Sequence, residues 1–150
     1  MKVTVYTDGS CIGNPGRGGW AAKLHVELKN GGVYAKTLSG NEAMTTNNRM
    51  ELTAVVKAVE ALRTSCTVHM HSDSAYVVNN YNRIPFWAAR RWRTADGKEV
   101  KNRDLWEKLD RLVREKGVDI RFQKVAGHTG VAGNEEMDTI ARWEASRLVR

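Results

Sequence analysis

The spacing of apolar residues changes along this chain, and that change constrains the fold more than any other feature. Residues 2–8 alternate apolar and polar side chains, a pattern typical of a half-buried β-strand. Two further strand-like runs, 20–29 and 33–39, flank a glycine pair at 31–32, and glycines there favour a hairpin turn. The first 40 residues therefore predict three antiparallel strands, with the Gly- and Pro-rich residues 10–19 as a loop.

Beyond these strands the apolar spacing becomes helical. Leu52, Val55 and Val59 fall on one face of a helix. Similar reasoning predicts a helix at 48–63, a strand at 67–72, helices at 74–82 and 102–116, a strand at 118–122 and a closing helix at 134–149. Strands joined through helices run parallel. We therefore expect one α/β domain over residues 1–150, whose five-stranded mixed sheet has three antiparallel strands, then two parallel ones, flanked by helices.

Charge and composition narrow the class of partner. The chain has 24 Lys and Arg against 17 Asp and Glu, a net charge of +7, which makes nucleic acid the first partner to consider. No apolar stretch approaches the roughly 20 residues needed to cross a bilayer, and the N-terminus has no signal-peptide pattern. We expect a cytoplasmic protein with no membrane partner. The two cysteines show no C-x-x-C spacing, which argues against a zinc site or a disulfide framework.

Four acidic residues lie where predicted elements meet loops. Asp8 and Asp73 end two apolar runs, while Glu51 and Asp138 lie near the starts of two predicted helices. Sites in sheets with parallel strands form outside the carboxyl ends of those strands, so Asp8 and Asp73 are expected to share one pocket. Hard cations such as Mg²⁺ prefer oxygen ligands. The four carboxylates thus predict a divalent metal centre, on a basic chain suited to a polyanionic substrate.

Each of the four acids also has a purely structural explanation. Asp8 precedes Gly9 and suits a turn, and Glu51 could complete a capping box with Asn48. Asp73 suits a helix N-cap, and Asp138 suits the positive end of a helix dipole. Four such coincidences at one edge of a sheet are less expected than one shared site.

The motifs around these acids resemble those of type 1 ribonuclease H. They are TDGSCIGNPG, TTNNRMEL, SDS, KNRDLWEKL and VAGHTGVAGNEEMD, and in this order they cover nearly the whole chain. The resemblance implies a ribonuclease H-like fold and an endonuclease that cleaves the RNA strand of RNA/DNA hybrids. It implies two-metal-ion catalysis with Mg²⁺ or Mn²⁺, leaving 5′-phosphate and 3′-hydroxyl ends. It also implies that the metal ligands are Asp8, Glu51, Asp73 and Asp138.

A glycine-rich segment at 125–134 carries His128. Histidine is the side chain best suited to proton transfer near neutral pH. Taken alone, His128 could equally be a solvent-exposed loop residue. The resemblance implies a catalytic histidine, which would transfer protons or assist product release.

Substrate contacts are expected from short polar residues, because the 2′-hydroxyl and groove shape mark RNA in a hybrid. The resemblance assigns such contacts to the first glycine-rich loop and to the start of the first helix: Cys11, Gly13, Asn14, Thr46, Asn47 and Asn48. Helix capping is the alternative for the two adjacent asparagines. Ala75 stands where the family often has Gln, and Asn79 could compensate in part.

Residues 83–103 hold seven basic and two acidic residues. Trp87 and Trp92 interleave with this charge, and aromatic rings can pack on sugars or bases. The segment resembles the family's basic protrusion, which grips the DNA strand; the alternative is a solvated helix with both tryptophans in the core. Pro85 would interrupt a continuous helix there.

Three other functions fit parts of this pattern. A binding module of the same fold would not need a carboxylate cluster, a related nuclease would cut duplex DNA equally well, and a ribonuclease H portion of a reverse transcriptase would belong to a longer chain. We expect instead a free-standing, monomeric enzyme.

Overall fold

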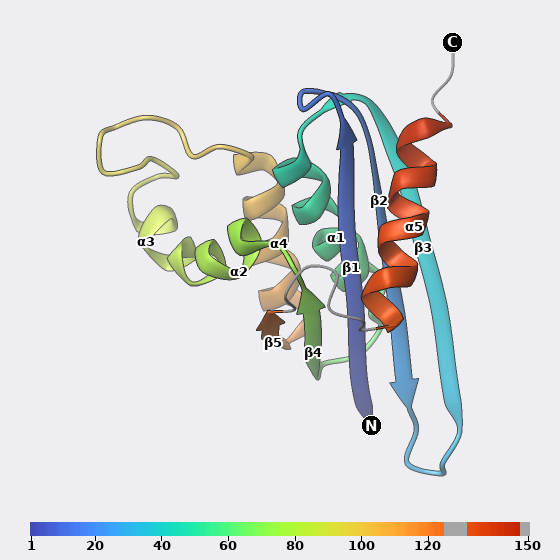
Figure 1. The fold of residues 1–150 in the computed structure, drawn as a ribbon. Coiled ribbons are helices and arrows are strands. Elements are labelled where there is room, and N and C mark those ends of the chain that lie inside the picture. The colour runs from blue at the N-terminus through green and yellow to red at the C-terminus, as the bar shows by residue number, and fades with distance from the viewer. Residues whose placement is uncertain (125–131, 148–150) are drawn as a thin grey trace.

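The computed structural model describes residues 1–124 and 132–147. Its centre is a five-stranded sheet with the order β3-β2-β1-β4-β5 (Figure 1). β1 pairs antiparallel with β2 and parallel with β4, and β2–β3 and β4–β5 complete the mixed sheet. The predicted α/β fold is confirmed. The strands are β1 (Lys2–Ile12), β2 (Gly16–Glu27), β3 (Val33–Thr45), β4 (Cys66–Ser72) and β5 (Val118–Lys124).

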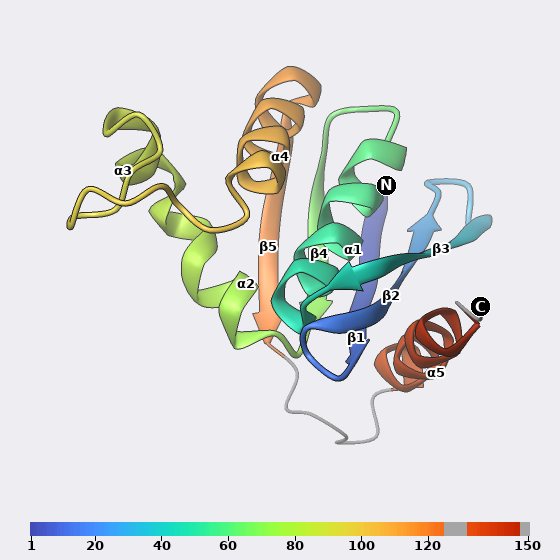
Figure 2. The same cartoon turned by 90° about the horizontal axis from the view of Figure 1, so that it is seen from above.

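Helices cover both faces of the sheet. α1 packs against β1, β2 and α4 on one face, while α5 packs against β1, β2 and β3 on the other (Figure 2). The helices are α1 (Asn47–Ala61), α2 (Ala75–Asn80), the 3₁₀ turn η1 (Tyr81–Arg83), α3 (Ile84–Ala89), α4 (Arg103–Lys116) and α5 (Ala132–Ser146). In the described part of the chain, none is long and apolar enough to span a membrane.

The main core lies between the sheet and the α1–α4 layer. Trp106 of α4 is its largest fully buried side chain, and Leu52 and Met70 are also fully buried. A smaller cluster of Ala21, Met137 and Ala141 joins α5 to the other face. The side chains of β1 between these two layers are therefore buried, as Val5, Thr7 and Asp8 are.

The first hairpin differs from the prediction of a loop at 10–19. β1 continues to Ile12 and β2 begins at Gly16, so this segment is mostly paired strand. The glycines there serve close packing: a Cβ on Gly19 would lie 2.2 Å from the Ala141 carbonyl oxygen of α5. Composition alone was misleading, because glycine marks close approach of backbones as well as loops.

The basic segment leaves the body of the sheet as α3 and an irregular return to α4. Pro85 lies in the first turn of α3, where its missing N–H is not needed, so the predicted interruption of the helix is confirmed. Trp87 and Trp92 are only 7% and 8% exposed, and the Trp87 ring lies 5.5 Å from that of Trp106. This corrects the expectation that these two rings pack on nucleic acid. Both rings lie in the core instead, because removing a large aromatic ring from water is strongly favourable.

Candidate active site

The site forms where β1 and β4 separate. Their parallel pairing runs from Val3–Val68 to Tyr6–His71, after which β4 ends and β1 continues beside β2. Asp8 therefore lies inside β1 rather than at its end, two residues beyond the last pair. Asp73 directly follows β4. The expectation that both acids share one edge of the sheet is met.

Helix α1 brings Glu51 to the same edge. Thr46 is the N-cap, its hydroxyl accepting from the Arg49 N–H at 3.2 Å. The helix thus begins at Asn47 and Glu51 is its fifth residue, which excludes a capping box between Asn48 and Glu51. α1 approaches β1 closely at Gly9, where a Cβ would lie 2.5 Å from the Glu51 backbone nitrogen.

Three carboxylates converge at this point. Asp8, Glu51 and Asp73 each offer one oxygen, and these oxygens all lie within 4.8 Å of one another. Asp8 Oδ1 accepts from the Gly9 N–H at 2.8 Å. Glu51 Oε2 is buried and has no hydrogen-bond partner among the described residues. Such an orphaned, buried oxygen in a group of like charges fits a cation ligand.

The electrostatics of the cluster point the same way. Burial, followed by repulsion from Asp73, raises the pKa of Asp8 to about 7. Burial, followed by repulsion from Asp8, raises the pKa of Glu51 well above its ordinary value. Neighbouring like charges and desolvation both disfavour the ionised form. A divalent cation would remove this penalty by neutralising the carboxylates.

Asp138 lines the same cavity as the three acids, and this cavity measures about 530 Å³. α5 begins at Ala132 rather than at 134, so Asp138 is the seventh helical residue and lies further from the helix start than predicted. Its carboxylate pairs with Arg142 at 2.9 Å. The structure therefore brings three of the four predicted ligands into one tight group and places the fourth beside it. The structural alternative for Asp73 is also excluded, because the N-cap of α2 is Ser74.

The predicted substrate-binding residues surround this cavity unevenly. Cys11, Asn47 and Asn48 line it. Asn14 Oδ1 accepts from the Asn47 N–H at 3.0 Å, so Asn14 ties the first hairpin to the start of α1, and Gly13 precedes it in the turn. Asn79 is exposed on α2 and is not among the lining residues. His128 lies outside the described residues.

Asn134 is a site residue that the sequence reasoning missed. From α5, its Nδ2 donates to the Thr7 carbonyl at 3.4 Å and to the His71 carbonyl at 3.3 Å. It thereby bridges β1 and β4 where they separate, next to Asp8 and Asp73. An asparagine at a helix start suggests only capping in the sequence, so no local signal could have revealed this bridge.

We expect Asn134→Ala to lower the free energy of unfolding by about 1–2 kcal/mol, the scale of losing two modest hydrogen bonds. Urea unfolding of the metal-free protein measures this. Asn30→Ala, in the exposed β2–β3 turn, is the matched control. Equal stability of Asn134→Ala and wild type would show that the bridge contributes nothing.

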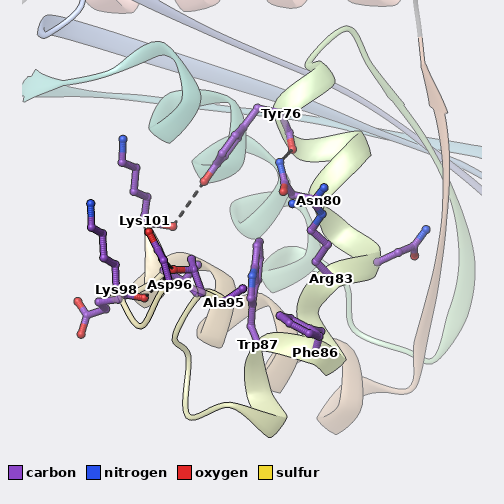
Figure 3. A pocket seen from close by; sticks show the side chains of 13 residues that line it. Tyr76, Asn80, Arg83, Phe86, Trp87, Ala95, Asp96, Lys98 and Lys101 are labelled. Atoms are coloured by element: carbon purple, nitrogen blue, oxygen red, sulfur yellow. Dashed lines mark hydrogen bonds between the residues drawn. The ribbon is translucent and has the colours of Figure 1, made fainter.

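A second cleft, about 820 Å³ in volume, lies between α2, α3 and the return loop (Figure 3). Arg83, Lys98 and Lys101 line it. The exposed aromatic ring of this region is Phe86, 46% exposed, with the Arg90 guanidinium 4.2 Å from its centroid. The basic segment thus offers an exposed ring, but from a residue that the sequence reasoning did not select.

Comparisons with known proteins agree with this geometry. A family model described as RNase H matches residues 1–146. A ribonuclease H of Nitratidesulfovibrio vulgaris is 51% identical over 149 residues, covering 98% of this chain and 91% of that protein. A ribonuclease H of Thermus thermophilus is 47% identical over 146 residues, covering 96% and 84%.

Solved structures share the fold. LC9-RNase H1, a type 1 RNase H with the type 2 active-site motif, superposes with a TM-score of 0.81 at 31% identity, covering 96% of this chain and 72% of that one. LC11-RNase H1, solved in complex with an RNA/DNA hybrid, has a TM-score of 0.68 at 20% identity and covers 97% of both chains. The second likeness concerns the fold alone.

Proposed function

This chain belongs to the ribonuclease H family and is a ribonuclease H that cleaves RNA in RNA/DNA hybrids, and from this premise we propose that its catalysis depends on divalent metal held by Asp8, Glu51 and Asp73. The observation that carries the proposal is the convergence of their oxygens within 4.8 Å. The orphaned Glu51 Oε2 supports it. Asp138, which lines the same cavity, would complete the ligand set once substrate is present.

The ion is proposed to be Mg²⁺, with Mn²⁺ as a substitute. A pair of such ions, when bound, supplies an activated water and stabilises the leaving oxygen. Asp8, Glu51 and Asp73 would hold the ions, and the close approach of α1 to β1 at Gly9 brings Glu51 towards Asp8. His128 is proposed to move a proton at the site or to assist product release. The expected products carry 5′-phosphate and 3′-hydroxyl ends.

Recognition of the hybrid is proposed to divide between the two cavities. Cys11, Asn47 and Asn48 would meet the RNA strand, where short polar groups suit the 2′-hydroxyl. The flanking residues Gly13, Asn14 and Thr46 would shape that surface, since the latter two already stabilise the start of α1.

The second cleft, between α2, α3 and the return loop, is called the protrusion cleft from here on, and it would meet the DNA strand. Its cations Arg83, Lys98 and Lys101 are suited to phosphates, and Phe86 is the exposed ring that could pack on a sugar or base. The enzyme is proposed to act as a monomeric, single-domain protein of the cytoplasm.

Cleavage of end-labelled duplexes tests the proposed function. We expect cuts in the RNA strand of RNA/DNA, little cutting of RNA/RNA or DNA/DNA, activity with Mg²⁺ or Mn²⁺, and none with EDTA. Treating the products with a 5′-phosphate-dependent exonuclease checks the chemistry of the ends. Activity that persists in EDTA would overturn the metal assignment, and equal cutting of duplex DNA would overturn the substrate assignment.

A further inference from the structure

Tyr76 lines both cavities. It belongs to the wall of the carboxylate cavity and to that of the protrusion cleft, and Figure 3 shows its ring at one end of that cleft. Tyr76 lies on α2, three residues after Asp73. The chain therefore passes from a metal ligand to the cleft wall within one helical turn.

The Tyr76 hydroxyl is the centre of a hydrogen-bond network. It accepts from the Trp106 Nε1–H at 3.0 Å and from the Asn102 Nδ2–H at 3.1 Å. It donates to the Lys101 carbonyl at 3.5 Å, the dashed contact in Figure 3. Tyr76, at the start of α2, thus meets Lys101 and Asn102, at the end of the return loop, through one oxygen.

Asn102 has an unusual conformation for this task. It is the residue before α4 and adopts the left-handed region, with φ of 59°, which asparagine tolerates better than most residues. Its side chain makes no capping bond to α4. Instead, Oδ1 accepts from Arg49 Nη1–H at 3.3 Å while Nδ2 donates to Tyr76.

Arg49 extends the network to the helix that carries Glu51. Its guanidinium binds both carboxylate oxygens of Asp104, at 3.0 and 2.6 Å, and this pairing holds the pKa of Asp104 below its ordinary value. A bidentate pair fixes orientation as well as distance. α1, α2 and α4 are thereby joined through Arg49, Asn102 and Tyr76.

We infer that Asn102 and Tyr76 are positioning residues that set the spacing between the protrusion cleft and the metal-binding carboxylates, and so select which phosphodiester is cut. The chain between Asp73 and Asn102 forms α2, α3 and the return loop, which line the cleft. The network fastens these two ends to each other and to α1. The inference rests on the proposed function, in which the cleft holds one strand while the carboxylates act on the other.

Two variants loosen the network with little change of shape. Tyr76→Phe removes the shared oxygen and keeps the ring, and Asn102→Gly removes the amide and keeps the left-handed backbone. Tyr34→Phe, on exposed β3, is the matched control. The probe is a hybrid with 5′-labelled RNA under Mg²⁺. A single turnover resolved to single nucleotides gives the cleavage pattern, and steady-state rates give kcat and KM.

We expect both variants to spread cleavage onto neighbouring phosphodiesters and to raise KM roughly three- to tenfold, the scale of one or two lost hydrogen bonds. We expect kcat to stay within about twofold, because the carboxylates remain in place. The double variant should match the more affected single variant, since both act through one network. Tyr34→Phe should cut as wild type does.

An unchanged cleavage pattern and KM in variants that remain folded by circular dichroism would overturn the inference. So would a fall in kcat at constant KM, which would place the residues in the chemical step instead. Failure of wild type to cut the hybrid would refute the proposed function itself, and this result is distinct from either of the other two.

Discussion

Asp8→Asn is expected to reduce hybrid cleavage at least about 10³-fold while making the metal-free protein more stable at pH 8. The loss of activity follows because Asp8 is the most buried of the three convergent acids. A factor of 10³ corresponds to roughly 4 kcal/mol of lost transition-state stabilisation, a usual cost of removing one positioned electrostatic group.

The gain in stability follows from the raised pKa. An acid whose pKa is 3.8 when unfolded and about 7 when folded binds its proton more tightly in the native state. Metal-free wild type should therefore lose stability as pH rises from about 4 to about 7, by up to roughly 4 kcal/mol. Asn cannot ionise, so the variant should escape this loss, and the two proteins should converge below about pH 4.

Urea unfolding in EDTA across this pH range measures the effect, with cleavage in Mg²⁺ measured in parallel. Asp73→Asn serves as the companion variant for activity and should also lose hybrid cleavage. Near-wild-type cleavage by either variant would overturn the metal assignment. If Asp8→Asn is less stable than wild type at pH 8, the favourable contacts of the Asp8 carboxylate outweigh its burial and its repulsion from Asp73.

Gly9→Ala is expected to destabilise the protein and to lower cleavage together. The added Cβ would meet the Glu51 nitrogen at 2.5 Å and the Met50 carbonyl carbon at 2.6 Å. Both atoms are backbone, so helix α1 must move away from β1. Overpacking of this kind costs roughly 1–3 kcal/mol, and a shift of about 1 Å in a catalytic group costs about 10²-fold in rate.

Gly32→Ala is the control for this substitution. Its Cβ would meet side-chain atoms alone, the nearest being the Asn30 oxygen at 3.0 Å and Leu28 Cδ1 at 3.5 Å in an exposed turn, so we expect a change within about 0.5 kcal/mol. Urea unfolding and hybrid cleavage with saturating Mg²⁺ are compared for both variants. If Gly9→Ala cuts as fast as wild type, the close approach of α1 does not position Glu51.

The mixed sheet and the sites of three carboxylates were predictable from local patterns. Alternation gave β1 and β4, and the rule that sites form at the carboxyl ends of parallel strands placed Asp8 beside Asp73. The structural alternatives for Glu51 and Asp73 were settled only by the caps, because Thr46 and Ser74 occupy the N-cap positions. The N-cap is the residue whose backbone is still extended while the next residue is helical, as at Thr46 and Ser74, and the sequence does not report that torsion.

The surroundings of the protrusion could not be predicted in the same way. Trp87, Trp92 and Phe86 stand close together in a basic segment, and nothing in their order says which rings are buried. Trp106, from α4, provides the surface that the Trp87 ring contacts. Such a choice depends on contacts between residues distant in the sequence, which periodicity cannot report.

The sequence by itself determined the order of strands and helices, the charge of the molecule and the acids that could bind metal, because these follow from side-chain spacing and chemistry along one chain. Only the tertiary structure decided that Glu51 reaches Asp8 across Gly9, that Asn134 bridges β1 and β4, and that Asn102 joins Arg49 to Tyr76. The hydrogen-bonded pairs among these contacts join residues that lie 26 to 127 positions apart in the sequence. Their distances are set by how the helices pack on the sheet, which is a property of the whole fold.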